Sequence, residues 1–318
     1  MKRLLSLCVT LALLPAPLHA QPLTETESAA IDREVTATLA RTGVPSVSIA
    51  VVRNGHVVLA RAWGKASETL GAATPAMPYQ IASNSKQFLA ALILRLADEG
   101  KLSLDDHVSR WLPDVSGADT MTVRQLLSHT SGLQDYWPQD YAFDAMKAPT
   151  TPDAIIARWA KKPLDYAPGT RWQYSNTGYV VAGRIAEIAG GAPLPDLFAR
   201  YLFGPLQIHP VFIDDASGPE FPHGYDRHAL GPVRPVTPPA RGWLYAAGEL
   251  SMTPAELAAW DMARLNRSLL SPQDWAMQET PVRLSDGTVI AHVVGKKSLR
   301  GSLVDDSNCP WHHLCFMS

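Results

Sequence analysis

The stretch Ser83-Asn84-Ser85-Lys86, at the head of SNSKQFLAALILRLADEGKL (83–102), decides the fold and places a serine one helical turn before a lysine. Apolar residues recur there at helical spacing until Gly100, which predicts a helix from about Ser83 to Glu99. On such a helix the serine and the lysine, at i and i+3, share one face. A serine hydroxyl is a weak nucleophile until a base takes its proton, and a partly desolvated lysine can help. For the tetrapeptide alone, a helix N-cap followed by a solvated lysine is the preferred interpretation.

A second candidate for chemistry is Tyr174-Ser175-Asn176, which follows the turn Pro168-Gly169-Thr170 and opens the apolar run YVVAGRIAEIAG. A tyrosine beside cationic lysines can have a lowered pKa and act as a general base. The asparagine amide can be presented to a substrate carbonyl or to the lysine. For the tripeptide alone, the preferred interpretation is a helix N-cap with a partly buried tyrosine.

The rest of the chain predicts a few strands followed by many helices. The run VPSVSIAVVRNGHVVLARAWG (44–64) is typical of a β-hairpin, because Asn54-Gly55 favours the left-handed torsions of a type I′ turn. Thr122 and Gln125 have the spacing of a capping box at the start of a short helix. This order predicts an α+β fold. The expected further helices are 24–41, 152–161, 177–190, 193–203, 253–265 and 271–278, and 214–240 is expected to be a long surface loop.

The hairpin needs partner strands, because two strands alone are marginal in water. The middle of the chain offers few strand signals, so we expect the partners at the C-terminal end.

Residues 1–20 have the pattern of a signal peptide: Lys2 and Arg3, an apolar core, and Leu18-His19-Ala20 before Gln21. We therefore expect an exported protein, periplasmic or secreted, without a stable membrane anchor. The formal net charge of −2 does not indicate a nucleic-acid surface. We expect no nucleic-acid partner and a monomer.

Four flanked motifs occur together in the order IASNSKQFLAALILRLADEGKLSLDDHVSRWLPD, MTVRQLLSHTSGL, PGTRWQYSNTGYVVAGRIAEIAGG and GWLYAAGELSMTPAELAAW. The stretch from about 44 to 265 thereby resembles the serine β-lactamase and penicillin-binding protein superfamily, especially its class C-like and esterase branch. The resemblance implies a β-lactamase/transpeptidase-like fold, in which an antiparallel sheet flanked by helices stands beside an all-helical lobe. It places the hydrolase domain at 21–292, with the α/β lobe from 24–80 and the C-terminal part, and the helical lobe at about 81–270.

The resemblance also implies roles for single residues. Ser83 would be the acyl-forming nucleophile, Lys86 its activating partner, Tyr174 the base that relays the proton to the leaving group, and Asn176 a substrate-binding residue that also positions the lysine. The implied reaction is acyl transfer without a metal or cofactor. The substrate could be a β-lactam, a D-amino-acid peptide of the cell wall or a small ester, and the sequence does not choose among them.

Two histidine-bearing segments invite other interpretations. His129 could be a triad histidine, but in Ser128-His129-Thr130-Ser131-Gly132-Leu133 the resemblance makes it part of a turn that supports the site, and we expect a structural role. His223, Tyr225 and His228 in the long loop could border a substrate cleft or belong to ordinary proline-rich surface.

The family pattern stops after about His292. Members of the family carry a third motif there, Lys-Thr-Gly or His-Ser/Thr-Gly, on a strand that lends a backbone N–H to the oxyanion hole. No such tripeptide follows Asp286-Gly287-Thr288, and Lys296-Lys297-Ser298 lacks the glycine. We therefore expect the C-terminal strands and helix to be incomplete and 293–318 to be an aberrant tail, truncated or read in a shifted frame.

The cysteines and histidines of this tail, in Cys309-Pro310-Trp311-His312-His313-Leu314-Cys315, are poorly spaced for a tetrahedral metal site, and we expect no metal. Two hypotheses follow for the whole chain. One is an exported serine hydrolase, and the other is a catalytically impaired or non-catalytic protein that keeps the cleft for binding.

Overall fold

The sheet of the fold begins with a long hairpin. Strands β1 (Ser46–Arg53) and β2 (His56–Gly64) are antiparallel and pair along their whole length in the computed structural model, which describes residues 21–137, 144–212, 218–227, 229, 231–290 and the backbone of 314–317. Asn54 and Gly55 join the strands with φ angles of 52° and 76°. These left-handed torsions are the ones that the Asn-Gly turn predicts, so the predicted hairpin is confirmed.

The free edge of β1 pairs with a strand from the other end of the chain. Strand β10 (Leu314–Met317) is antiparallel to β1, with Ser48 opposite Met317, so the strand order is β10-β1-β2. The expectation that partner strands come from the C-terminal end is confirmed for these four residues. Beyond α10 (Pro272–Glu279) the described residues contain only short strands: β8 (Val282–Arg283), β9 (Val289–Ile290) and β10. The expected signal peptide and residues 291–313 lie outside the described residues.

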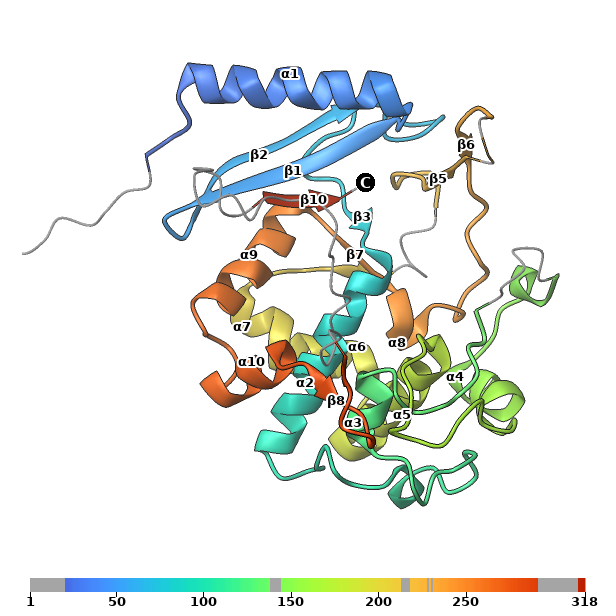
Figure 1. The fold of residues 1–318 in the computed structure, drawn as a ribbon. Coiled ribbons are helices and arrows are strands. Elements are labelled where there is room, and N and C mark those ends of the chain that lie inside the picture. Colours follow the sequence, from blue (N-terminus) through green and yellow to red (C-terminus); the bar gives the residue numbers. More distant parts are fainter. Residues whose placement is uncertain are drawn as a thin grey trace, which may run out of the picture.

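One helix covers each face of this sheet, as Figure 1 shows. Helix α1 (Glu25–Thr42), which begins with a capping box between Thr24 and Glu27, buries Val35 against Ile49 and Val51. Helix α9 (Pro254–Leu265) lies against the opposite face and contacts β1, β2 and β10. The alternation of side chains along β1 explains this arrangement, since Ile49 and Val51 face α1 while Ala50 joins the larger core on the other side.

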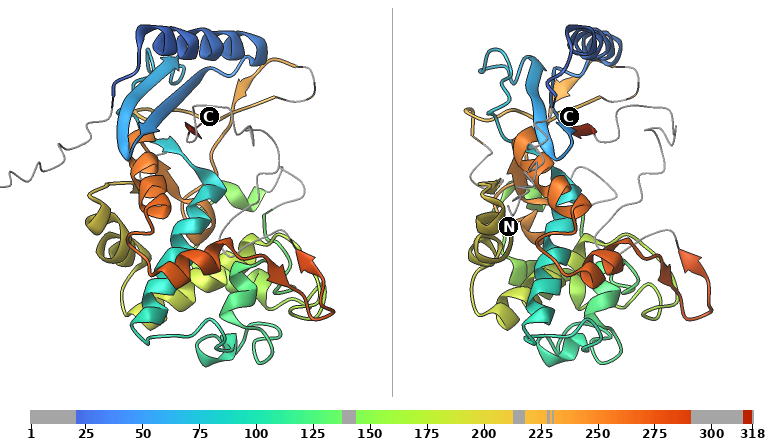
Figure 2. Two further views of the ribbon diagram at one scale, coloured as in Figure 1. Left: turned by 60° about the vertical axis from the view of Figure 1, so that its left-hand side comes forward. Right: turned by 90° about the vertical axis from the view of Figure 1, so that its left-hand side faces the viewer.

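The larger core belongs to the helical lobe, which lies on the side of the sheet away from α1 in both views of Figure 2. Its centre is α2 (Lys86–Asp98), in which nine of the 13 residues are buried, and α5 (Asn176–Gly190) packs beside it. The predicted α+β class with a sheet lobe and a helical lobe is confirmed. Further helices of the lobe are α3 (Val123–Leu127), α4 (Pro152–Ile155), α6 (Leu194–Phe198), α7 (Gly204–Leu206) and α8 (Tyr245–Gly248), and α10 packs against α2.

Two predicted helices differ in detail from the structure. The helix expected at 152–161 is α4 followed by a wider π-type turn at Ile156–Ala160, and the helix expected at 193–203 is α6 followed by a similar turn at Ala199–Phe203. Among the described residues, every helix is too short or too polar to cross a bilayer.

Short strands lie between the two lobes, close to Ser83. Strand β7 (Leu250–Met252) pairs with β3 (Tyr79–Gln80) and with β4 (Val211–Phe212), and the chain passes from β3 directly into the helix that follows. The predicted loop at 214–240 contains a small ribbon of β5 (Tyr225–Asp226) and β6 (Arg234–Pro235).

Candidate active site

Ser83 lies in a tight turn between a strand and a buried helix. The turn Ala82–Ser85 is a 3-10 helix that runs into α2, so the predicted helix over 83–99 is present with a tighter first turn. Ile81 N–H donates to the Leu250 carbonyl (2.9 Å), which ties the turn to β7. Ala82 has a φ of 45°, a left-handed torsion that a residue with a side chain rarely adopts. Ser83 is exposed together with Ala82 and Asn84, while Ser85 and Lys86 that follow are buried. Strained backbone of this kind is typical of functional sites.

Lys86 is the buried cation of the site. Its side chain is only 3% exposed, although lysine is almost never buried without partners. Its ammonium donates to Ser83 Oγ (3.2 Å), to Asn176 Oδ1 (2.8 Å) and to the carbonyl of Ala247. These acceptors come from three different elements, so the lysine fixes α5 and α8 relative to the serine.

Tyr174 completes the contact with the serine. Its Oη lies 2.7 Å from Ser83 Oγ, and the Lys86 ammonium lies 5.0 Å from the centre of its ring. Burial raises the pKa of Tyr174, the hydrogen bond with Ser83 opposes this, and the negative charge of Asp135 adds to the rise. The lowered pKa that a lysine neighbour can give a tyrosine is therefore not found at Tyr174, because burial is the largest influence on its pKa. At neutral pH Tyr174 is a phenol.

Asn176 is the first residue of α5 and faces the lysine. Its Oδ1 accepts from Lys86, while its Nδ2 donates to Asp135 Oδ2 (3.1 Å) and its backbone N–H donates to Asp135 Oδ1 (3.0 Å). The structure thus brings together all four residues that the sequence singled out. Asp135 was missed, and the only sequence signal for it was its place in the aspartate-rich loop after Leu133.

His129 packs against the ring of Tyr174. Its ring lies 4.4 Å from the ring of Tyr174, and its Nδ1 accepts the backbone N–H of Ser175 at 3.2 Å. Both contacts agree with the structural role that we expected. Neither directs the imidazole at Ser83.

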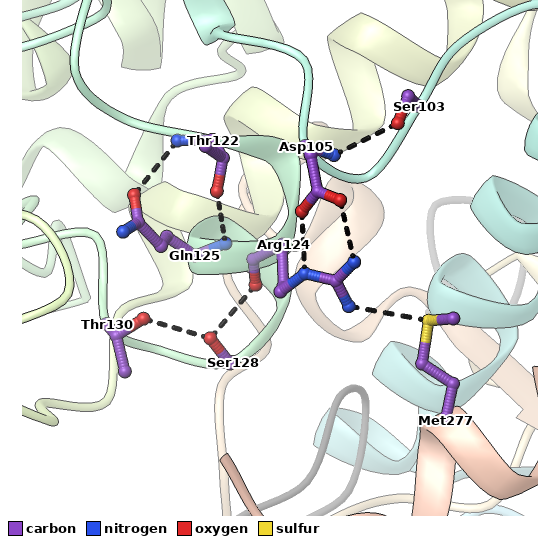
Figure 3. A network of polar contacts seen from close by, with 8 residues as sticks. All are labelled: Ser103, Asp105, Thr122, Arg124, Gln125, Ser128, Thr130 and Met277. Carbon is purple, nitrogen blue, oxygen red and sulfur yellow. Dashed lines mark hydrogen bonds and ion pairs between the residues drawn. The ribbon is translucent and has the colours of Figure 1, made fainter. Parts of the chain in front are cut away.

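A polar network holds the turn that carries His129 (Figure 3). Thr122 and Gln125 form the predicted capping box of α3, and Ser128 Oγ donates to the Arg124 carbonyl and contacts Thr130 Oγ1. The guanidinium of Arg124 binds both carboxylate oxygens of Asp105, at 2.9 and 3.2 Å. These bonds connect α3 to the loop after α2 and so orient the turn at 128–133 under Tyr174.

Helix α8 packs closely against α5 at Gly183. This close packing places the Ala247 carbonyl next to the Lys86 ammonium. A Cβ at Gly183 would lie 2.5 Å from Ala246 Cβ and 2.8 Å from Tyr245 Cε1. Real Cβ atoms do not approach so closely, so α8 would have to move away.

We therefore expect Gly183→Ala to lower the free energy of unfolding by about 1–3 kcal/mol, measured by urea titration. Gly178→Ala, on the same helix, is the control, because its nearest neighbour would be a carbonyl oxygen at an ordinary 3.5 Å. A Gly183→Ala variant as stable as Gly178→Ala would contradict the close packing of α8 on α5.

A cavity of about 450 Å³ adjoins the serine turn through Ala82. It is lined by Tyr79 on one side and by His223, Tyr225 and Arg227 of the long loop on the other. Glu68 fixes this loop, since it contacts His223 Nδ1 (3.1 Å) and accepts from Tyr225 Oη (2.7 Å). His223 and Tyr225 therefore line a cavity, and His228 lies outside the described residues.

The expectations for the tail remain predictions. The third-motif region and the cysteine-histidine cluster fall on residues 291–313 and on the side chain of Cys315, which lie outside the part described. Among the described residues, no group of three or more histidine, cysteine, aspartate or glutamate side chains could hold a metal ion.

The fold and the site define a protein of the serine β-lactamase and penicillin-binding class. The chain belongs to the Beta-lactamase family, whose model matches residues 31–289. The match ends close to the point where the family pattern stops in the sequence.

Similar proteins include penicillin-binding proteins and amidases. A penicillin-binding protein of Bacillus subtilis is 29% identical over 236 residues, which are 68% of this chain and 51% of that protein. A D-amino acid amidase from Ochrobactrum anthropi has a TM-score of 0.71 at 27% identity, over 80% of this chain and 74% of that one. A D-stereospecific amidohydrolase from Streptomyces has a TM-score of 0.69 at 28% identity, over 84% and 82%. The chain spans about half the length of the curated relatives it matches.

Proposed function

We propose that this chain is a serine hydrolase that forms an acyl-enzyme at Ser83 and hydrolyses an amide or ester. The observation that supports the proposal most strongly is the shared position of Ser83 Oγ, 2.7 Å from Tyr174 Oη and 3.2 Å from Lys86 Nζ. A nucleophile within hydrogen-bond reach of a group that can take its proton, with a third group that orients the pair, is the usual arrangement for covalent catalysis.

The proposed reaction uses these three groups in sequence. Ser83 Oγ attacks the carbonyl carbon while its proton passes to Tyr174 Oη. Tyr174 passes its own proton to the departing amine or alcohol, so the leaving group departs neutral, and Lys86 stays an ammonium throughout. Water then attacks the acyl carbon, one of its protons returns through Tyr174 to Ser83 Oγ, and the acid is released.

The substrate class that we propose first is an amide or short peptide of a D-amino acid. Two structural neighbours are described as a D-amino acid amidase and a D-stereospecific amidohydrolase, and other relatives are described as D-alanyl-D-alanine carboxypeptidases. The cavity beside Ala82 has the volume of a small-molecule site, which is about 300–1,000 Å³, but Ser83, Lys86 and Tyr174 do not line it, so it adds little to the choice of substrate. A β-lactam and a small ester share the same chemistry and belong in the same assay.

Mass spectrometry after incubation with a fluorophosphonate or a fluorescent penicillin tests the proposal. We expect one adduct per chain, mapped by digestion to the peptide that contains Ser83. A panel of D-amino-acid amides, their L-enantiomers, small esters and β-lactams then identifies the substrate. An unmodified chain, or an adduct on another peptide, would refute the proposal.

The alternative of an impaired enzyme or a binding module rests on one observation, the absence of a third motif after about residue 292 in this sequence. Loss of one oxyanion donor typically costs about 10²–10³ in rate. We therefore expect the chain as given to acylate slowly.

A chimera that replaces the residues after 292 with the corresponding segment of a family member is expected to raise the acylation rate by about 10²–10³-fold. The rate constant of labelling, measured by quenched time points, checks this. A second chimera that carries the same segment with its motif glycine changed to valine is the control. Equal rate constants for this chain and the first chimera would show that the missing third motif does not limit the acylation rate.

Export of the mature chain to the periplasm or medium is part of the same proposal. The signal-peptide pattern of residues 1–20 supports it, and a small molecule or cell-wall peptide is the partner we propose there.

A further inference from the structure

The carboxylate of Asp135 lies next to Asn176, which in turn contacts Lys86 in the proposed active site. It is half-buried, in the loop after the turn 128–133, and it contacts the start of α5. Its Oδ1 accepts the backbone N–H groups of Asn176 (3.0 Å) and Trp137 (3.1 Å), and its Oδ2 accepts Asn176 Nδ2 (3.1 Å). Three donors therefore converge on one carboxylate, and two of them come from a single residue.

These bonds determine which way the Asn176 amide points. An ionised carboxylate can only accept hydrogen bonds and an ammonium can only donate them. With Asp135 on one side and Lys86 on the other, the amide must turn its NH₂ to the aspartate and its oxygen to the lysine. The observed distances, 3.1 Å and 2.8 Å, match this orientation. A neutral residue at 135 would remove one of these two constraints and leave only the one from Lys86.

The charge of Asp135 also acts on the groups around Ser83. Burial raises the pKa of Asp135, and its three hydrogen bonds and the Lys86 charge oppose that rise. In turn the aspartate charge contributes to the raised pKa of Tyr174. Tyr174 is also faced by the Lys86 ammonium, 5.0 Å from its ring, and by the His129 ring at 4.4 Å.

We propose that Asp135 is a positioning residue, which orients Asn176 and through its amide holds Lys86 at Ser83. The inference rests on the proposed acylation of Ser83. In this role Asp135 is a fixed negative charge next to the Asn176 amide, and it acts without touching the substrate.

The test is Asp135→Asn in the full chain, with a fluorophosphonate as probe. We expect the acylation rate constant to fall about 10- to 100-fold, as is usual when a residue that orients a reacting group is lost. The constant for reversible probe binding is expected to change less than threefold. In an Asn176→Ala background the same substitution is expected to cost less than threefold, because the amide that transmits the effect is absent.

A second readout does not require activity. The ¹³Cζ resonance of Tyr174, in protein labelled with ¹³C-tyrosine and assigned with Tyr174→Phe, reports ionisation of the phenol. Loss of a neighbouring negative charge favours the phenolate, so Asp135→Asn is expected to move this titration to lower pH. Asp165→Asn is the control: this exposed carboxylate accepts from the Gln173 side chain at 2.7 Å, and its loss should leave both the rate and the Tyr174 titration unchanged.

Each outcome decides something. An Asp135→Asn variant with an unchanged rate and an unchanged Tyr174 titration would overturn the proposal and leave Asp135 as a simple helix cap. Equal costs in the wild-type and Asn176→Ala backgrounds would overturn it as well.

A fallback variant is Asp135→Glu, which keeps the charge and is used if Asp135→Asn does not fold. It is expected to retain the Tyr174 titration while lowering the acylation rate constant, and a shifted titration would count against the proposal. If the unaltered chain is never labelled, the proposed acylation fails, while the titration still tests Asp135.

Discussion

Ser83→Ala is expected to abolish covalent labelling by a fluorophosphonate or a penicillin. The hydroxyl lies within reach of both Lys86 Nζ and Tyr174 Oη, and alanine offers no atom for the acyl group. The Ser83 side chain is exposed, and without it the buried Lys86 ammonium keeps Asn176 Oδ1 and the Ala247 carbonyl as acceptors, while the half-buried Tyr174 hydroxyl can bind water. We expect the free energy of unfolding to change by about 0.5 kcal/mol or less, as for other surface substitutions. Intact-protein mass spectrometry and a urea titration measure the two quantities.

Ser85→Ala is the matched control, and the opposite result is expected. Ser85 is only 3% exposed, and its Oγ accepts the backbone N–H of Leu250 at 3.1 Å. Its loss leaves that N–H buried without this partner, which costs about 1–3 kcal/mol of stability. Labelling should persist, since Ser85 touches neither the lysine ammonium nor the tyrosine hydroxyl in any contact that the structure records for them. Persistent labelling of Ser83→Ala at the wild-type rate would exclude Ser83 as the nucleophile.

Local sequence signals predicted most of the fold. The Asn54-Gly55 turn, the capping box of Thr122 and Gln125, and the apolar pattern after Lys86 each involve residues that lie close together in the chain. The pattern could not show the tighter first turn of the Ser83 helix. That turn depends on Ala82 at positive φ and on a bond from Ile81 to Leu250, a residue from a distant part of the chain.

The same limit applies to the site. Ser83, Lys86, Tyr174 and Asn176 could be named because they lie in motifs that a family resemblance connects. The carbonyl of Ala247 could not, because a backbone group 161 residues from Lys86 carries no side-chain signal. Asp135 lies 41 residues from Asn176, and its bonds to that residue appear only once α5 is in place. The raised pKa of Tyr174 could not be read from the sequence, because the extent of its burial follows from tertiary packing.

Tyr174→Phe is expected to lower the acylation rate constant by about 10²–10⁴-fold, the usual contribution of a positioned proton-transfer group. Phenylalanine keeps the ring against His129 and under the Lys86 ammonium, and it removes only the oxygen that lies 2.7 Å from Ser83 Oγ. The reversible binding constant of the probe should therefore change little. Time-resolved labelling at several probe concentrations separates the rate from the binding constant.

Tyr166→Phe shows whether the loss is specific to the hydroxyl at the serine. Tyr166 is also partly buried, its pKa is raised to about 12 by burial, and its hydroxyl donates to the His129 carbonyl at 3.3 Å. It is thus a second desolvated tyrosine beside the same histidine, with no contact to Ser83 among those the structure records for its hydroxyl. We expect its substitution to leave the rate within about threefold, since it carries no proton of the reaction. If both variants lost rate equally, the role of Tyr174 would be the packing of His129. A large loss in Tyr174→Phe alone would assign proton transfer to the Tyr174 hydroxyl, because that oxygen is what distinguishes the two sites.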